Sequence, residues 1–179
     1  MGRRERGNGV RDSVNKSVAR ESGQEAARSR PELAERNLAP DLLRLEPIDA
    51  AAMTAYNAWP NPVAGYPWED VHGWKQRDRK GLDLALWYDT QLCGLCYATP
   101  RGGKLTITIV LLERSAGPGN PLQGLVMAMM VVTLIDYAAI LGCKEILVQD
   151  PEPGAVPHYQ RQGFAIQGST KKPRLVLTV

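Results

Sequence analysis

The clearest hydrophobic pattern along the chain is a series of short apolar runs separated by Gly, Pro and Asp, which predicts β-strands. Residues 82–88 and 91–99 are two such runs joined by a two-residue turn, and they predict an antiparallel hairpin. Residues 105–112 alternate threonine with isoleucine and predict the next strand. The remaining predicted strands span residues 42–45, 145–149, 164–167 and 175–179.

Helical segments with their own start and stop signals lie between these strands. Asp49 can cap a first helix, while Asn120 and Pro121 begin a long apolar helix that Gly142 ends. The predicted helices span residues 50–59, 69–79, 121–141 and 156–162. The resulting order β-α-α-β-β-β-α-β-α-β-β predicts an α/β fold, with a central mixed, mostly antiparallel twisted sheet flanked by helices.

The long apolar helix allows two interpretations. Residues 124–141 contain only two clearly polar side chains, Thr133 and Asp136, and about 18 apolar residues approach the lower limit for a membrane span. Asp136, the lack of flanking basic anchors and the immediate continuation into a strand favour a helix buried against the sheet. We therefore expect no membrane association.

Charge is distributed unevenly. Residues 1–40 hold nine basic and six acidic side chains, whereas residues 41–179 hold thirteen of each. The neutral body gives no reason to expect a nucleic-acid partner. The first 40 residues lack aromatic side chains and have few large aliphatic ones, so we expect a disordered basic extension before a domain at 41–179. With no apolar signal segment, the expected location is cytoplasmic and the expected state a monomer or homodimer.

Cys93 and Cys96 have the CxxC spacing of zinc or redox sites. They lie in an apolar strand, where positions i and i+3 face opposite sides, and His72 and His158 lack metal-ligand spacing to them. These cysteines, with Cys143, are therefore expected to be buried structural thiols, and no metal is expected.

The Gly-rich segment before the long helix is a candidate phosphate site, because a helix N-terminus offers free backbone amides. Gly119 and Gly124 have the spacing of a Walker motif, but residues 125–126 are Leu-Val instead of Lys-Ser/Thr. Gly117 could begin a dinucleotide fingerprint, but Leu122 occupies its third Gly position. Both nucleotide motifs are therefore disfavoured.

Residues 142–164 carry the most specific pattern: a helix end, a buried strand, a Pro/Gly loop and a short helix with Tyr159 four residues before Gly163-Phe164. This order resembles the coenzyme-binding half of the GCN5-related N-acetyltransferases, the GNAT family. Their pattern A-x-x-F-Y-x-x-x-G-F matches Ala155, Tyr159, Gly163 and Phe164, with His158 in place of the first Phe.

The resemblance extends over residues 43–179 and implies a single GNAT-like domain. It also implies that acetyl-CoA is the cosubstrate and that the acetyl group passes to a primary amine of a small molecule or peptide. The runner-up interpretation is a GNAT-like interaction or regulatory module that has lost catalysis.

The family loop Q/R-x-x-G-x-G/A can be placed in two registers. Arg114, Gly117 and Gly119 match it literally, whereas the second register uses Gly124 with poorer matches at its other positions. The helix length implied by the family favours Gly124. The backbone amides expected on the pyrophosphate are then those of Gln123, Gly124, Leu125, Val126 and Met127.

The resemblance also implies roles for individual residues. Tyr159 would protonate the thiolate that leaves, although a tyrosine packed on a short helix would look the same. Glu113 would act as base for the amine, or be a solvent-facing strand end. A free amide at Leu111 or Leu112 could polarise the thioester carbonyl. Tyr66 and Trp68 would line the acceptor pocket, or belong to the core.

Overall fold

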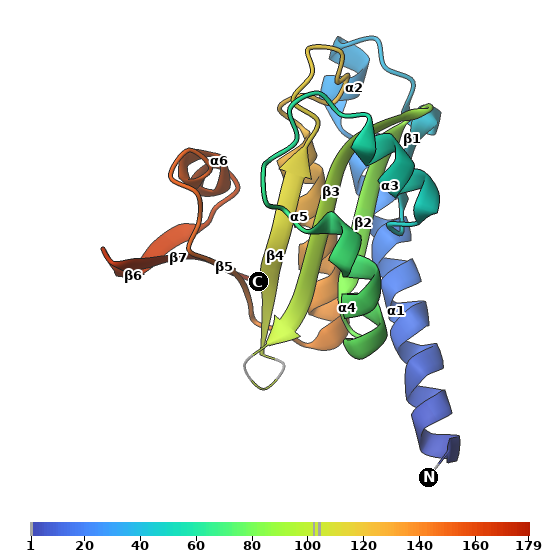
Figure 1. The fold of residues 1–179 in the computed structure, drawn as a ribbon, viewed down its shortest axis with the longest axis vertical. Coiled ribbons are helices and arrows are strands. Elements are labelled where there is room, and N and C mark those ends of the chain that lie inside the picture. The colour runs from blue at the N-terminus through green and yellow to red at the C-terminus, as the bar shows by residue number, and fades with distance from the viewer. Residues whose placement is uncertain (1, 102, 104) are drawn as a thin grey trace.

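Seven strands form one sheet in the order β1-β2-β3-β4-β5-β7-β6 in the computed structural model, which describes residues 2–101, 103 and 105–179 (Figure 1). Every pair of neighbours is antiparallel except β4 and β5. The strands are β1 Leu43–Glu46, β2 Leu82–Tyr88, β3 Gln91–Arg101, β4 Thr106–Arg114, β5 Glu145–Gln149, β6 Ala165–Ser169 and β7 Lys172–Thr178. The predicted mixed, mostly antiparallel sheet is confirmed.

Helices cover both faces of this sheet. Helices α3 (Ala50–Asn57) and α4 (Val71–Arg77) lie on one face, and α5 (Val126–Leu141) lies on the other, with α1 (Gly2–Arg28) beside it and against β1 (Figure 1). Each face therefore has its own hydrophobic core. The shorter helices are α2 Pro31–Glu35, α6 Val156–Arg161, and the 3₁₀ turns η1 Pro40–Leu42 and η2 Trp68–Asp70.

Helix α5 begins later than the sequence predicts. The Asn120 side chain accepts a hydrogen bond from the Leu122 N–H (3.0 Å) and donates to the carbonyls of Cys93 and Ser115, so it caps a turn. Residues 121–125 continue as turns, and Gly124 has φ +82°, which a right-handed helix excludes. The helix therefore starts at Val126 instead of Pro121. Its C-terminal end at Gly142 is as predicted.

Other local predictions have mixed outcomes. Asp49 caps α3 as predicted, because its carboxylate accepts from the Ala52 N–H at 2.8 Å. Strand β3 runs to Arg101, two residues beyond the prediction, and part of the turn predicted over 100–103 lies outside the described residues. Within the described chain, no helix combines the length and apolar character needed to cross a bilayer.

The cysteines of the CxxC segment face the same core instead of opposite sides. The register between β2 and β3 shifts between Leu86 and Trp87, which leaves Cys93 as an extra residue in a β-bulge. The bulge reverses the alternation, so Cys93 and Cys96 both join the core under α5. They are free thiols, and burial raises the pKa of Cys93 to about 12.

Residues 2–40 do not form the disordered extension that the sequence predicted. Helix α1 packs along α5 and against β1, and Ala19, Ala27 and Leu33 are buried. Composition gave a misleading picture because the contact uses small side chains, which allow two helices to approach closely, and buried polar bonds in place of large apolar groups. The extension and the sheet are parts of one packed body.

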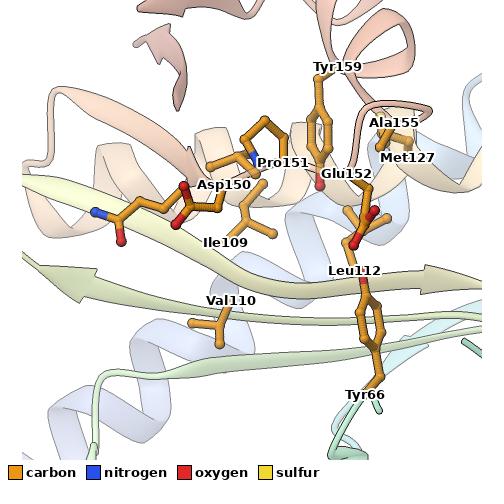
Figure 2. A pocket seen from close by; sticks show the side chains of 12 residues that line it. Tyr66, Ile109, Val110, Leu112, Met127, Asp150, Pro151, Glu152, Ala155 and Tyr159 are labelled. Carbon is orange, nitrogen blue, oxygen red and sulfur yellow. The ribbon is translucent and has the colours of Figure 1, made fainter. Parts of the chain in front are cut away.

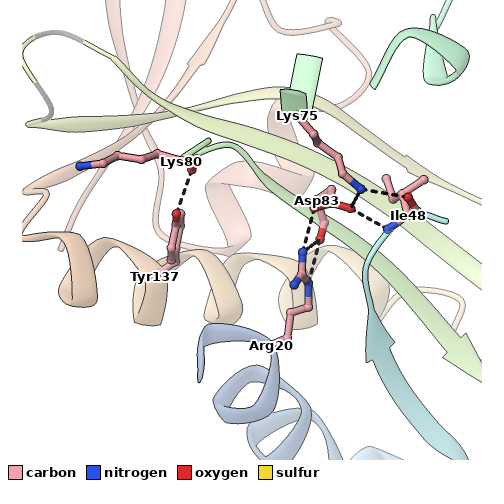
Figure 3. Close-up of polar contacts among 6 residues, drawn as sticks. All are labelled: Arg20, Ile48, Lys75, Lys80, Asp83 and Tyr137. Atoms are coloured by element: carbon pink, nitrogen blue, oxygen red, sulfur yellow. Dashed lines mark hydrogen bonds and ion pairs between the residues drawn. The ribbon is translucent and has the colours of Figure 1, made fainter. Parts of the chain in front are cut away.

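A buried polar network attaches α1 to the sheet (Figure 3). Arg20 of α1 donates to the Asp83 carboxylate at 2.8 Å and to the Asp83 carbonyl. The same carboxylate accepts from Lys75 of α4 (2.6 Å) and from the Ile48 N–H (2.7 Å). Burial lowers the pKa of Arg20, while the adjacent Asp83 charge raises it. Four separate segments of the chain thus meet at one carboxylate.

The α1–α5 contact makes a prediction about two glycines of α1. A Cβ added at Gly23 would lie 2.7 Å from the Thr133 Cβ on α5, whereas at Gly7 it would meet no described atom within 4 Å. Gly23→Ala should lower the free energy of unfolding by about 1–3 kcal/mol through overpacking. Gly7→Ala, the matched control, should raise it by up to about 1 kcal/mol through helix propensity.

Urea denaturation of both variants measures these changes. Equal stabilisation by the two alanines would show that α1 does not pack on α5.

Candidate active-site cleft

Strands β4 and β5 separate partway along their length. They pair only between residues 106–109 and 145–148. A β-bulge at Val110 marks the separation, because Tyr97 and Ala98 of β3 pair with Leu111 and Ile109 and skip Val110. Beyond it, the backbone groups of β4 that point toward β5 have no strand partner among the described residues, and Leu111 and Leu112 lie in this stretch.

The bulge also changes which side chains face which layer. Ile107 and Ile109, before it, pack in the core under α5, whereas Leu111, after it, packs in the core under α3 and α4. Glu113 follows Leu111 by two residues and therefore shares its face. Leu112 points the other way and lines a cavity at the point where the strands separate.

This cavity has a volume of about 220 Å³ and lies between β4, the start of α5 and the β5–α6 loop (Figure 2). Tyr159 and Tyr66 enter it from opposite sides with their hydroxyl groups directed inward, and Glu152 lies between those two hydroxyl ends (Figure 2). Tyr66, Leu112, Met127, Glu152, Ala155 and Tyr159 are among its lining residues. The cavity thus collects side chains from four separate segments.

Tyr159 combines a fixed ring with a free hydroxyl. It is 5% exposed, and its ring packs edge-on against Phe164 with centroids 5.2 Å apart. Within the described part of the chain, its hydroxyl makes no hydrogen bond. Burial, with smaller contributions from Cys96 and Tyr66, raises the pKa of Tyr159 above its ordinary value. The hydroxyl therefore stays protonated at neutral pH and can donate a proton into the cavity.

Glu113 is buried outside the cavity and is not the solvent-facing strand end that the sequence allowed. It is 5% exposed, and one carboxylate oxygen accepts from the Val63 N–H (2.7 Å) while the other accepts from the Trp68 indole N–H (2.6 Å). Trp68 is itself buried, and neither side chain lines the cavity. The two hydrogen bonds of Glu113 fix the loop that carries Tyr66. Of the two predicted acceptor residues, Tyr66 is the one that reaches the cavity.

Two carboxylates that sequence reasoning missed line the cavity instead. Asp150 and Glu152 lie in the loop after β5, and neither side chain has a hydrogen bond to the described residues. Their position at the carboxyl end of a parallel strand, in a Pro/Gly loop, was the available signal. They can attract an ammonium group or accept its proton.

The predicted phosphate loop meets the same cavity at its last residue, Met127. Gln123 and Gly124 are exposed, whereas the side chains of Leu125 and Val126 are buried. The N–H groups of Gln123 and Leu125 already donate to the carbonyls of Asn120 (3.1 Å) and Leu122 (2.9 Å), so they are not available to a pyrophosphate as predicted. The first N–H groups of α5 have no partner within the helix, and no described side chain caps them. Of residues 123–127, Met127 is the one that lines the cavity.

Arg36 is a second residue that the sequence did not indicate. Its guanidinium donates to the carbonyls of Pro121 (3.2 Å) and Gln123 (2.8 Å), which holds a cation beside the free amides of α5. It belongs to the segment expected to be disordered, so no sequence motif pointed to it. Together the amides and the guanidinium suit a diphosphate.

Comparisons with known proteins agree with this geometry. No protein-family sequence model and no curated protein matches the chain significantly. Among solved structures, it is similar to a GNAT family acetyltransferase from Elizabethkingia anophelis with acetyl-CoA bound (TM-score 0.55, 15% identity, 78% of this chain and 99% of that one). Ard1 from Thermoplasma volcanium is also similar (TM-score 0.59, 10% identity, 77% and 98%).

The third similar structure is the ribosomal-protein-S18-alanine N-acetyltransferase from Escherichia coli (TM-score 0.55, 15% identity, 76% of this chain and 92% of that one). The three share their fold with this chain over nearly their whole length, although few residues are identical. With its sheet order, its separated central strands and these neighbours, the chain has the fold of the GCN5-related N-acetyltransferases.

Proposed function

We propose that this protein transfers an acetyl group from acetyl-CoA to a primary amine. The observation that carries the proposal is the cavity where β4 and β5 separate, with the unpartnered hydroxyl of Tyr159 directed into it. The acetyl-CoA bound to the Elizabethkingia anophelis enzyme of the same fold supports the choice of cosubstrate.

Coenzyme binding follows from the groups at the start of α5 and along β4. The diphosphate accepts hydrogen bonds from the amides of Gly124, Val126 and Met127 and faces the Arg36 guanidinium, whereas the amides of Gln123 and Leu125 already donate to backbone carbonyls. The pantetheine arm extends along the unpaired edge of β4. An N–H at Leu111 or Leu112 then donates to the thioester carbonyl and stabilises the negative charge that develops there.

The transfer itself needs a base and an acid. The neutral amine attacks the carbonyl carbon, the tetrahedral intermediate expels the coenzyme sulfur as a thiolate, and the Tyr159 hydroxyl gives that sulfur a proton. Glu152 or Asp150 accepts the proton lost by the amine, because both carboxylates face the cavity without partners among the described residues. No metal is required for these steps.

Glu113 takes a positioning role in this proposal. Both of its oxygens are already bonded to the loop that carries Tyr66, so it sets the shape of the acceptor side. The competing assignment for Glu113 is the role expected from the sequence, that of base for the amine. The alternative for the protein as a whole is a catalytically inactive GNAT-like module, against which the open cavity and the free tyrosine hydroxyl argue.

The coenzyme site makes the first functional prediction. Gly124→Asp should weaken acetyl-CoA binding by at least tenfold, because it places a like charge beside the diphosphate. Gly124→Asn is the matched control, since it imposes the same backbone strain at φ +82° without the charge and should weaken binding much less. Calorimetry measures both, and an absence of acetyl-CoA binding to the unmodified protein would refute the enzyme proposal.

The second functional prediction concerns Tyr159. Tyr159→Phe keeps the ring contact with Phe164 and removes only the proton donor. The turnover number should fall roughly 10²–10⁴-fold, as for other acid–base groups, while acetyl-CoA affinity and the melting temperature stay nearly constant. Thiol release under conditions where chemistry limits the rate measures the change. Turnover within about twofold of the original would assign Tyr159 to packing.

The third functional prediction concerns Glu113. Glu113→Gln leaves one acceptor oxygen for two donors, so the loop should loosen, the melting temperature should fall and the acceptor KM should rise. The acidic limb of the pH profile of kcat/KM should persist, because the base is elsewhere. Glu152→Gln is the comparison variant and should weaken that limb with an unchanged melting temperature. Loss of the limb in Glu113→Gln alone would restore Glu113 as the base.

A further inference from the structure

A second cavity, of about 240 Å³, lies on the α4 side of the sheet. Val110, the residue in the β4 bulge, borders both this cavity and the one that holds Tyr159. The two cavities therefore adjoin at Val110. The second cavity is lined by Trp74, Arg77, Asp78, Tyr97, Thr99, Arg101 and Val110.

Positive charge dominates this cavity. Arg77 ends α4 and Arg101 ends β3; both are exposed, and neither forms an ion pair with any described residue. Asp78 is the one acidic residue of the lining, and its carboxylate already accepts hydrogen bonds from the Thr99 hydroxyl and the Lys80 N–H. The groups left available to a ligand are therefore two guanidinium donors.

Tyr97 adds a neutral donor to the same cavity lining. It is 2% exposed, and its hydroxyl has no hydrogen-bond partner in the part of the chain that the structure describes. Burial and the nearby Asp78 and Asp83 charges raise the pKa of Tyr97 to about 12, against smaller opposing effects of Arg101 and Arg77. The hydroxyl is thus protonated and within the field of both guanidiniums. Trp74 packs on its ring, with centroids 5.5 Å apart.

We propose that this cavity binds an acidic group of the acceptor, so that the acceptor is a primary amine carrying a carboxylate or a phosphate. Arg77, Arg101 and the Tyr97 hydroxyl hold the anion by charge-assisted hydrogen bonds. The amine end passes Val110 into the first cavity, where Asp150 and Glu152 provide the opposite charge. This inference rests on the proposed acetyl transfer and specifies its substrate class.

Matched amines test the substrate class. Thiol release from acetyl-CoA is measured with 4-aminobutyrate against butylamine, and with O-phosphoethanolamine against ethanolamine. We expect the acidic member of at least one pair to have a kcat/KM about 10- to 100-fold higher, the usual gain from a hydrogen bond to a charged group. The pair with the larger ratio distinguishes a carboxylate from a phosphate.

Variants connect that preference to the cavity. Arg77→Gln with Arg101→Gln should reduce the ratio between paired amines to near one. Arg11→Gln, an exposed site on α1 at the other face of the sheet, should leave the ratio unchanged. Melting temperatures check folding, since both mutated guanidiniums are exposed.

Binding gives a readout that does not depend on turnover. Calorimetric titration of the CoA-saturated protein should show heat with the preferred acidic amine, and the double variant should lose at least tenfold in affinity. If acetyl-CoA binds but neither acidic amine binds, or if the uncharged amines are acetylated equally well, the acidic-acceptor inference is wrong and the acetyltransferase proposal stands. If acetyl-CoA itself does not bind, the proposed function fails first.

Discussion

The arrangement of the layers depends on the hydrogen bonds and ion pairs of one group, the Asp83 carboxylate. It is 1% exposed on β2 and binds Arg20 from α1, Lys75 from α4 and the backbone N–H of Ile48. A buried carboxylate is tolerated only when its charge and its lone pairs are satisfied, and removing one partner of a buried pair costs about 3–5 kcal/mol. This is a large part of the roughly 5–15 kcal/mol that stabilises a typical domain. The network therefore fixes the N-terminal helix and α4 relative to one strand.

The consequences reach both cavities. Helix α4 is anchored through Lys75 and carries Trp74 and Arg77, which form a wall of the second cavity. Helix α1 packs along α5, whose first turn provides the free amides and Met127 at the first cavity. Arg36, just beyond α2, crosses to the carbonyls before α5. The N-terminal segment, which has few large apolar side chains, thus supports the part of the molecule proposed to bind the coenzyme.

One inserted residue on β4 makes the site itself. The bulge at Val110 ends pairing with β5, exposes a strand edge and reverses the facing of every later side chain on β4. Reversal turns Glu113 toward the α3–α4 layer, where it holds Val63 and Trp68, and turns Leu112 toward the cavity. Carboxylates in the first cavity and guanidiniums in the second then give the two ends of the proposed acceptor site opposite charge.

Short-range patterns in the sequence were enough to predict most elements and their order. Apolar alternation defined the β2–β3 hairpin and β4, Asp49 defined the start of α3, and Gly142 the end of α5, because these features depend on neighbours only a few residues away. The spacing around Tyr159 also predicted a short helix, and the structure shows that its ring is buried with the hydroxyl in a cavity.

Tertiary structure alone decided what distant segments do to one another. Residues 1–40 read as disordered because composition counts large apolar groups, whereas α1 is held by small contacts and by Arg20 on a strand 63 residues away. The bulges at Cys93 and Val110 are set by pairing register, which single-strand alternation leaves undetermined, so the facing of Cys93 and Cys96 and the burial of Glu113 were both unforeseen. The convergence of Arg77, Tyr97 and Arg101 likewise requires three segments to meet, and only the packed sheet brings them together.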